Sequence, residues 1–234
     1  MSTREAIALG SGAMFDRIAP RYDLLNRLIS FGLDRGWRTR AATAIADREH
    51  LQILDVATGT GDLALALAAT HGSAHIVGVD PSARMVELAD RKARARGLEA
   101  RVSFGAGAAE SLPYDDARFD AVTIAFGIRN VTDRPRALRE MRRVLRPGGQ
   151  LVVLELAEPR EGLLGPLARW HVHHVVPAVG AWLSGAREYR YLQASIARFP
   201  EPAQFASMLE EAGFERVAWS ALTFGAATLY MGTA

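Results

Sequence analysis

Apolar and polar positions fall into blocks from residue 51 onward, and these blocks predict strands and helices in alternation. Near-continuous apolar runs at residues 52–57, 75–80 and 150–157 predict strands, and shorter runs at 101–107 and 119–127 predict two more. Strands without an alternating polar face are typical of a parallel sheet that is covered on both sides. We therefore expect helices on both faces of a parallel sheet.

The stretches between these runs predict helices at residues 61–70, 82–96 and 133–145. In the last of them, apolar side chains recur at helical spacing. Ser82 is a suitable N-cap for the second helix, and a Pro-Gly turn at residues 146–149 ends the third. This alternation of strands and helices predicts a doubly wound α/β fold.

The ends of the chain complete the predicted single domain. A helical pattern broken at Pro20 precedes the sheet and suits a lid over a bound ligand. After Pro159 the rhythm breaks, and two further strands close a mostly parallel, seven-stranded sheet. We divide the domain into a helical lid (1–50), a ligand-binding core (51–159), a helical insertion that caps the sheet edge (160–197), and a C-terminal part (198–234) with a helix at 201–212 and strands near 215–220 and 226–231.

The composition is that of an ordinary globular domain, with 49% hydrophobic and 23% charged residues in 234. The absence of cysteine excludes disulfides, cysteine nucleophiles and thiolate metal sites. The net charge is only +2, and the arginines are interspersed with carboxylates, so we expect no nucleic-acid partner. No signal peptide is visible, and the longest apolar-leaning stretch, 175–183, is too short to span a membrane. We expect a cytoplasmic protein.

A glycine-rich turn follows the first predicted strand. Residues 59–64, Gly-Thr-Gly-Asp-Leu-Ala, match the G-x-G-x-x-G/A dinucleotide fingerprint. Asp80 follows about twenty residues later, where an acid that binds a ribose is expected. A P-loop is excluded because no Gly-Lys-Ser/Thr follows.

Two carboxylates beside this turn favour a cationic ligand over a dinucleotide. Asp55 lies late in the first strand and Asp62 in the first helical turn, where each would repel a pyrophosphate by about 1–4 kcal/mol. S-Adenosylmethionine carries a sulfonium and an ammonium instead of phosphate, and its ribose suits Asp80 equally well. The alternative is that Asp62 only complements the helix dipole and that Asp55 caps a turn.

Three segments in order resemble the menaquinone/ubiquinone C-methyltransferases, a family of class I methyltransferases. They are MFDRIAPRYDLLNRLISFGLDRGWR at 14–38, LDVATGTGDLA at 54–64 and FGIRNVTDRPRALREMRRVLRPGGQLVVLELAEP at 126–159. The resemblance runs from about Met14 to Gly232 and implies a Rossmann-like methyltransferase fold. Two positions depart from the family pattern, because alanines stand at 108 and 125 where polar side chains are usual. The implied contacts with S-adenosylmethionine are Ala57, Thr58, Gly59, Thr60, Gly61, Asp80, Ala108, Ala109 and Ala125.

The resemblance also implies the reaction, which is methylation of a ring carbon of demethylmenaquinol to give menaquinol. The partner is thus a prenylated quinol, and a benzoquinol of ubiquinone biosynthesis is left open as a further acceptor. Peripheral membrane contact and a homodimer are left open as well. The alternatives are a methyltransferase of the same fold with another acceptor, and an NAD(P)-dependent reductase.

Candidate catalytic residues follow the fourth strand and lie within the N-terminal lid. The resemblance assigns Arg129 to polarising the quinol hydroxyl or activating a water, and Asn130 to orienting the ring. The alternative for Arg129 is an ion pair with Asp133. Tyr22 and Asp23 could close over the ligands, or could serve as a packing side chain and a helix cap.

Three histidines in the insertion, His171, His173 and His174, raise the question of a metal. No carboxylate or fourth ligand is spaced to complete a site, and methyl transfer needs no metal, so we expect none. This segment is better suited to lining a pocket for the quinol and its tail.

Overall fold

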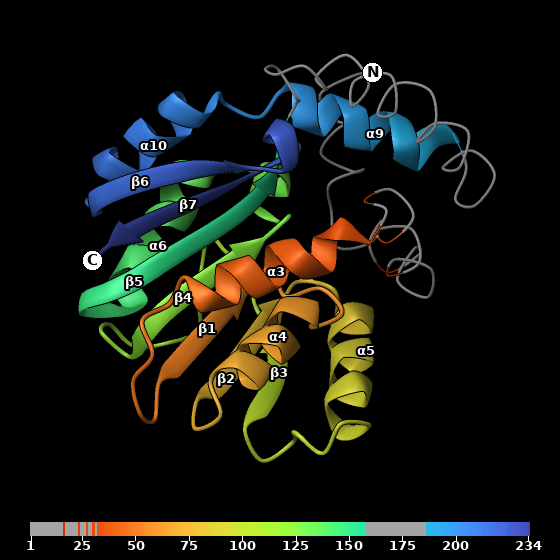
Figure 1. Cartoon of the computed structure of the whole chain (residues 1–234), viewed down its shortest axis with the longest axis vertical. Helices are drawn as coiled ribbons and strands as arrows, with labels where there is room; N and C mark the ends of the chain where they lie inside the picture. The colour runs from red at the N-terminus through yellow and green to blue at the C-terminus, as the bar shows by residue number, and fades with distance from the viewer. Residues whose placement is uncertain (1–15, 17–22, 24–26, 28–29, 31, 158–185) are drawn as a thin grey trace.

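The computed structural model describes residues 16, 23, 27, 30, 32–157 and 186–234, with only the backbone described for 186–190. The predicted histidine-rich segment and Tyr22 therefore lie outside the described residues. Figure 1 shows a central twisted sheet with helices packed on both of its faces. The carboxyl ends of the parallel strands meet at one edge of this sheet.

The sheet has seven strands in the order β3-β2-β1-β4-β5-β7-β6. All neighbouring strands from β3 to β5 pair in parallel, whereas β7 is antiparallel to both β5 and β6. This arrangement confirms the predicted mostly parallel, seven-stranded sheet. The strands are β1 (Gln52–Val56), β2 (His75–Asp80), β3 (Val102–Ala106), β4 (Phe119–Ala125), β5 (Leu145–Leu156), β6 (Glu215–Leu222) and β7 (Ala227–Thr233).

Helices cover both faces of the sheet and bury two apolar clusters. One cluster joins α3 and α4 to the sheet, and the other joins α6 and α10 to the opposite face. The helices among the described residues are α3 (Leu33–Thr43), α4 (Asp62–Thr70), α5 (Ala83–Arg94), α6 (Arg134–Val144), α9 (Ala186–Ala197) and α10 (Pro202–Glu211), with short 3-10 turns η1 (Ile128–Asn130) and η3 (Thr223–Gly225).

Local sequence signals predicted the ends of most helices and strands to within a few residues. Ser82 caps α5 as predicted, because its hydroxyl oxygen accepts the backbone N–H of Met85 at 3.1 Å. Residues 146–149, predicted as a Pro-Gly turn that ends the preceding helix, follow α6 and lie between the register pairs Phe119–Leu145 and Ala121–Gln150 of β4 and β5. They belong to β5, which begins at Leu145 and carries a bulge opposite β4. Gly149 permits this bulge, since a Cβ there would lie 2.8 Å from the carbonyl oxygen of Arg146.

The predicted N-terminal lid and the predicted insertion each contain one described helix. Helix α3 belongs to the predicted lid and packs on α4, and Trp37 on it donates a hydrogen bond of 2.8 Å to the hydroxyl of Thr223. Helix α9 belongs to the predicted insertion. No helix in the described ranges is both long enough and apolar enough to cross a membrane.

Candidate active site

Several of the predicted site residues lie at the carboxyl edge of the sheet, near the point between β1 and β4 where the strand order reverses. Ligands of open α/β sheets bind at such a switch point, because the two loops there diverge and leave a crevice. The loop between β1 and α4 forms one side of this crevice. Ala125, the last residue of β4, lies on the other side, and the turn η1 follows it along the chain.

The glycine loop turns sharply and lies close to neighbouring side chains. Gly59 and Gly61 have φ angles of 55° and 82°, in the left-handed region that favours glycine. A Cβ on Gly61 would lie 2.9 Å from the Phe104 ring and 3.0 Å from the Cβ of Ala89. Ala57 also has a positive φ, of 50°, which places backbone strain within the loop.

Asp80 ends β2 directly beneath this loop. One carboxylate oxygen accepts the backbone N–H of Gly59 and the other accepts that of Ser82, each at 2.9 Å. Burial raises the pKa of Asp80 above its ordinary value, and the two backbone hydrogen bonds oppose that rise. Because an ionised carboxylate accepts about four hydrogen bonds, Asp80 keeps acceptor capacity for a diol.

Asp55 lies under the loop and is almost fully buried, with 1% of its surface exposed. Its two carboxylate oxygens accept the hydroxyl groups of Thr58 at 2.6 Å and Thr123 at 2.7 Å. Burial raises the pKa of Asp55 from 3.8 to about 6, although these hydrogen bonds and the nearby Arg38 lower it in part. The carboxylate therefore braces the turn and also lines the pocket above it.

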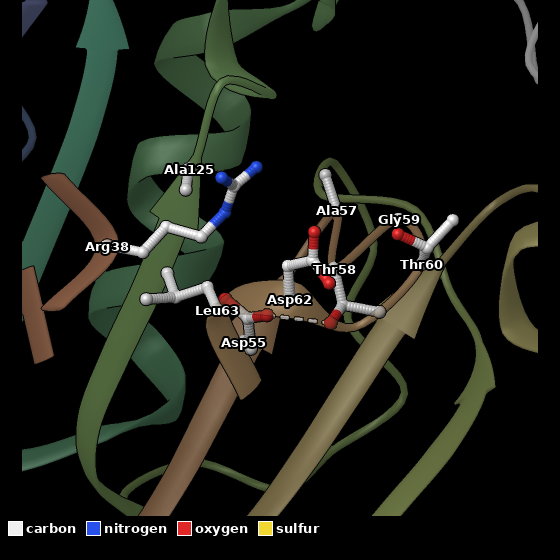
Figure 2. Close-up of a pocket in the computed structure, with 9 residues that line it drawn as sticks. All are labelled: Arg38, Asp55, Ala57, Thr58, Gly59, Thr60, Asp62, Leu63 and Ala125. Carbon is white, nitrogen blue, oxygen red and sulfur yellow. Dashed lines mark hydrogen bonds between the residues drawn. The ribbon is translucent and has the colours of Figure 1, made fainter. Parts of the chain in front are cut away.

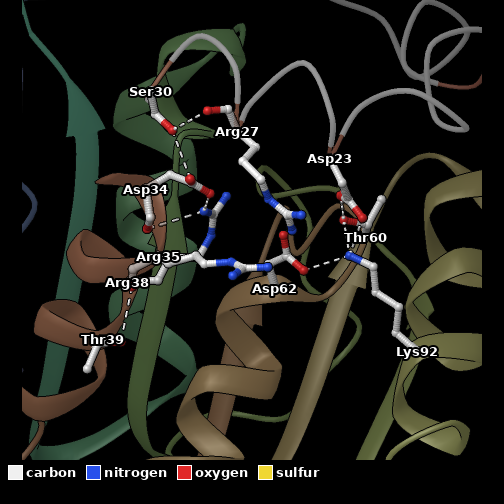
Figure 3. A network of polar contacts seen from close by, with 10 residues as sticks. All are labelled: Asp23, Arg27, Ser30, Asp34, Arg35, Arg38, Thr39, Thr60, Asp62 and Lys92. Carbon is white, nitrogen blue, oxygen red and sulfur yellow. Dashed lines mark hydrogen bonds and ion pairs between the residues drawn. The ribbon is translucent and has the colours of Figure 1, made fainter. Parts of the chain in front are cut away.

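Asp62 is not the uncompensated carboxylate that the sequence predicted. Its Oδ1 lies 2.6 Å from Nζ of Lys92, which also lies 2.5 Å from Oδ2 of Asp23 and donates to the Thr60 hydroxyl at 2.9 Å. The Thr60 hydroxyl in turn donates to Oδ1 of Asp23 at 2.5 Å. Figure 3 shows this network joining the N-terminal segment to the glycine loop through helix α5. No sequence pattern connects Lys92 on α5 with Asp62 on α4.

A pocket opens beside the loop, and Figure 2 shows the residues that line it. Five of the nine predicted cofactor residues line the pocket. Gly61 belongs to the same loop, and Asp80 accepts a hydrogen bond from the loop backbone. Ala108 and Ala109 are not among the lining residues. Ala109 is 6% exposed and packs in the apolar core, and Ala108 forms a β-bridge with Ser111. The lining consists of Arg38, Asp55, Ala57, Thr58, Gly59, Thr60, Asp62, Leu63 and Ala125.

Arg129 pairs with a buried carboxylate, and the predicted alternative of a pair with Asp133 is wrong. Its Nη1 lies 2.6 Å from Oε1 of Glu155, and its backbone N–H donates to Oε2 at 3.1 Å. Glu155 is fully buried on the adjacent strand β5, so its charge requires a nearby cation. Asp133 instead caps α6 by accepting the backbone N–H of Arg136 at 3.0 Å.

Asn130, the other catalytic candidate, is held from helix α9. The hydroxyl of Tyr191 donates to Oδ1 of Asn130 at 3.0 Å, and burial raises the pKa of Tyr191. Arg134 also holds η1, because it donates to the carbonyl oxygens of Ile128 at 3.2 Å and Arg129 at 3.0 Å. The backbone and side chains of this turn are thus fixed from three elements.

Sequence reasoning missed Glu155 and Tyr191. Glu155 had a usable signal, since it interrupts the apolar run of the fifth strand and a buried carboxylate is almost always paired. Tyr191 had none, because nothing in its local sequence relates it to Asn130. The structure brings together Arg129, Asn130 and these two partners around the turn that follows β4.

The fold and this crevice define a class of protein, the class I methyltransferases. The structure is similar to that of a SAM-dependent methyltransferase from Thermotoga maritima, with a TM-score of 0.63, 25% identity, and coverage of 94% of this chain and 98% of that one. The chain belongs to the ubiE/COQ5 methyltransferase family, whose model matches residues 5–234. It is therefore a methyltransferase, as the resemblance implied.

Two curated relatives match almost the full chain. The demethylmenaquinone methyltransferase of Deinococcus radiodurans is 50% identical over 220 residues, which cover 94% of this chain and 90% of that protein. The ubiquinone/menaquinone biosynthesis C-methyltransferase UbiE of Geotalea daltonii is 46% identical, with 94% of both chains covered.

Proposed function

We propose that this chain transfers the methyl group of S-adenosylmethionine to a ring carbon of demethylmenaquinol. The observation that carries the proposal is the identity of 50% across nearly the whole chain with a demethylmenaquinone methyltransferase. The name of the second relative, which joins ubiquinone to menaquinone, favours a demethylated benzoquinol as a further acceptor.

The crevice supports the donor half of this proposal. Asp80 lies beside the glycine loop and keeps acceptor capacity, so we assign it to the ribose diol, and we assign the loop glycines to close approach of the backbone to the ligand. Ala108 and Ala125 offer no polar side chain for an adenine, so we assign its amino group to backbone atoms or water. When bound, S-adenosylmethionine supplies an electrophilic methyl group on a positively charged sulfur.

The acceptor half is assigned to the turn η1. Transfer forms a bond between the methyl carbon and the quinol ring carbon, breaks the sulfur–methyl bond, and releases one proton from the ring. We assign Asn130 to orienting the ring and Arg129 to polarising the hydroxyl whose electron density activates that carbon. Tyr22, outside the described residues, remains a proposed lid residue for the same site.

Transfer of labelled methyl groups to demethylmenaquinol, a demethylated benzoquinol and no acceptor tests the function. We expect Asp80→Ala mainly to raise KM for the donor and Arg129→Ala mainly to lower kcat, because the first contacts the cofactor and the second the reacting ring. Arg139→Ala, at an exposed position of α6, is the matched control. Transfer to neither quinol would contradict the acceptor assignment. Binding of NAD(P)H without binding of S-adenosylmethionine would contradict the donor assignment.

Contact with a membrane stays a prediction with its own test. The prenyl tail of the acceptor must leave the site, and an apolar exit near a bilayer would accommodate it. Absence of binding to liposomes that contain the lipid quinone, together with efficient methylation of a short-tail analogue, would make that contact unnecessary.

A further inference from the structure

Arg38 lies across the pocket from the glycine loop. It comes from helix α3, and 7% of its surface is exposed. Figure 2 shows its guanidinium beside Ala125, on the opposite side of the pocket from Thr58. Arg38 is the only cationic side chain among the residues that line this pocket in the described part of the chain.

The guanidinium is held in place before any ligand binds. Its Nη1 pairs with the carboxylate of Asp34, one helical turn earlier, and also donates to the carbonyl oxygen of Asp34 at 3.4 Å. Asp34 is itself buried and accepts the hydroxyl of Ser30 at 2.8 Å. The Cζ of Arg38 lies 5.0 Å from the centre of the Phe126 ring. Figure 3 shows the same side chain within the polar network of α3.

Part of the guanidinium remains available for a ligand. Within the described part of the chain, all hydrogen bonds from the Arg38 side chain use Nη1, so Nε and Nη2 have no protein acceptor. A guanidinium presents these donors as a rigid fork that matches the two oxygens of a carboxylate. Because the side chain is already ordered, little rotamer entropy remains to be lost when a ligand binds.

The other side of the pocket has the opposite charge. Asp55 and Asp62 line it, and Asp62 is shared with Lys92. A ligand with a carboxylate and an ammonium on one carbon would meet Arg38 with its anionic end and the aspartates with its cationic end. The amino-acid portion of the methyl donor has this charge pattern.

We propose that Arg38 binds the α-carboxylate of the amino-acid portion of S-adenosylmethionine and of the product S-adenosylhomocysteine. This inference rests on the proposed function, since it presupposes the donor. The competing role is purely structural, in which Arg38 serves only as the counterion of the buried Asp34. The two roles differ in which ligands a change at Arg38 would affect.

Calorimetric titration with two nucleosides separates the ligand-binding role of Arg38 from the purely structural one. S-Adenosylhomocysteine carries the carboxylate, whereas 5′-methylthioadenosine lacks the whole amino-acid portion but keeps the ribose and adenine. We expect Arg38→Gln to weaken the binding of S-adenosylhomocysteine by about 10- to 100-fold, as for loss of a hydrogen-bonded charge. The binding of 5′-methylthioadenosine should weaken by less than about threefold. Asp80→Asn should weaken both nucleosides alike, because it acts on the ribose. Arg40→Gln, at an exposed position of the same helix, should weaken neither.

A second variant covers the case in which Arg38→Gln fails to fold. Asp34→Asn combined with Arg38→Gln removes both charges of the buried pair, which is tolerated better than removal of one. The selective loss of affinity for S-adenosylhomocysteine should persist in this double variant. Equal losses for the two nucleosides, or no loss for either, overturn the role of Arg38. If the parent protein binds neither nucleoside, the donor assignment itself fails.

Discussion

Asp55 makes stability depend on pH at the scale of a single residue. Burial raises its pKa from 3.8 to about 6, so the folded state holds a proton that the unfolded state has already released. The contribution of Asp55 to stability is therefore fully present below about pH 4 and is lost as pH rises through about 6. This loss opposes the usual behaviour of paired surface carboxylates, which stabilise the folded state as they ionise.

Asp55→Asn should remove this dependence. We expect the free energy of unfolding of the variant, relative to the parent, to rise by about 2 kcal/mol between about pH 4.5 and about pH 7. Urea unfolding at the two pH values measures the difference, and other titrating groups cancel between the proteins. Asp115→Asn, at an exposed position, is the control. A relative stability that stays constant across this range would show that Asp55 is ionised throughout it.

Charge compensation was the main residue-scale feature that the sequence did not reveal. In the sequence, Asp55 and Asp62 stand beside the loop with no cation next to them, and they favour the methyl donor that family membership supports. In the structure Asp62 is paired with Lys92, and Asp55 accepts two threonine hydroxyls. The carboxylates beside the loop thus belong to a polar network, in which Lys92 is shared between Asp62 and Asp23.

At the scale of elements, the start of helix α4 depends on glycine for two separable reasons. Gly61 and Gly32 both precede a helix in the left-handed region, with φ of 82° and 76°. A Cβ on Gly32 would meet nothing within 4 Å, whereas one on Gly61 would meet Phe104 and Ala89. Only Gly61 therefore combines the backbone requirement with close packing.

Paired alanine substitutions should separate these costs. We expect Gly32→Ala to lower the free energy of unfolding by about 1 kcal/mol, from the φ angle alone. Gly61→Ala should cost about 1–3 kcal/mol more, because the Cβ of Ala89 cannot rotate away from the added methyl. Thermal or urea unfolding measures both. Equal losses at the two positions would mean that the surroundings of Gly61 relax without cost.

The elements themselves were largely predictable, and the reason is local. Strands β1, β2 and β4 and helices α4 to α6 follow from apolar periodicity and from caps such as Ser82. The boundary of β5 was not predictable. Residues 146–149 read locally as a Pro-Gly turn, whereas in the structure they form an irregularity of β5 between the register pairs Phe119–Leu145 and Ala121–Gln150.

At the scale of the whole molecule, the described residue Asp23 is joined to helix α5 by its ion pair with Lys92. The two side chains are 32% and 25% exposed, and their charged atoms lie 2.5 Å apart. A double-mutant cycle of Asp23→Asn and Lys92→Met should give a coupling energy of about 0.2–1 kcal/mol in unfolding experiments. This coupling should shrink in about 1 M salt, where charges are screened beyond about 3 Å.

The Arg84–Glu87 pair provides a control for this cycle. Its side chains are 46% and 52% exposed and lie on one helix, so it joins no separate parts of the chain. We expect a weaker coupling there. A coupling between Asp23 and Lys92 that is absent at low salt would show that this contact does not hold Asp23 to helix α5.

The sequence by itself determined the alternation of elements, the glycine loop with Asp80, and the candidate residues Arg129 and Asn130. The elements and the loop depend on periodicity and on short motifs, which act over a few residues, whereas Arg129 and Asn130 were assigned through the resemblance to the family. Tertiary structure decided the partners: Lys92 for Asp62, Glu155 for Arg129, Tyr191 for Asn130, and Arg38 for the wall of the pocket. Most of these pairs join different elements. These side chains meet only because the packed sheet brings segments that are distant in the sequence to one edge. No local sequence pattern indicates contacts over such separations.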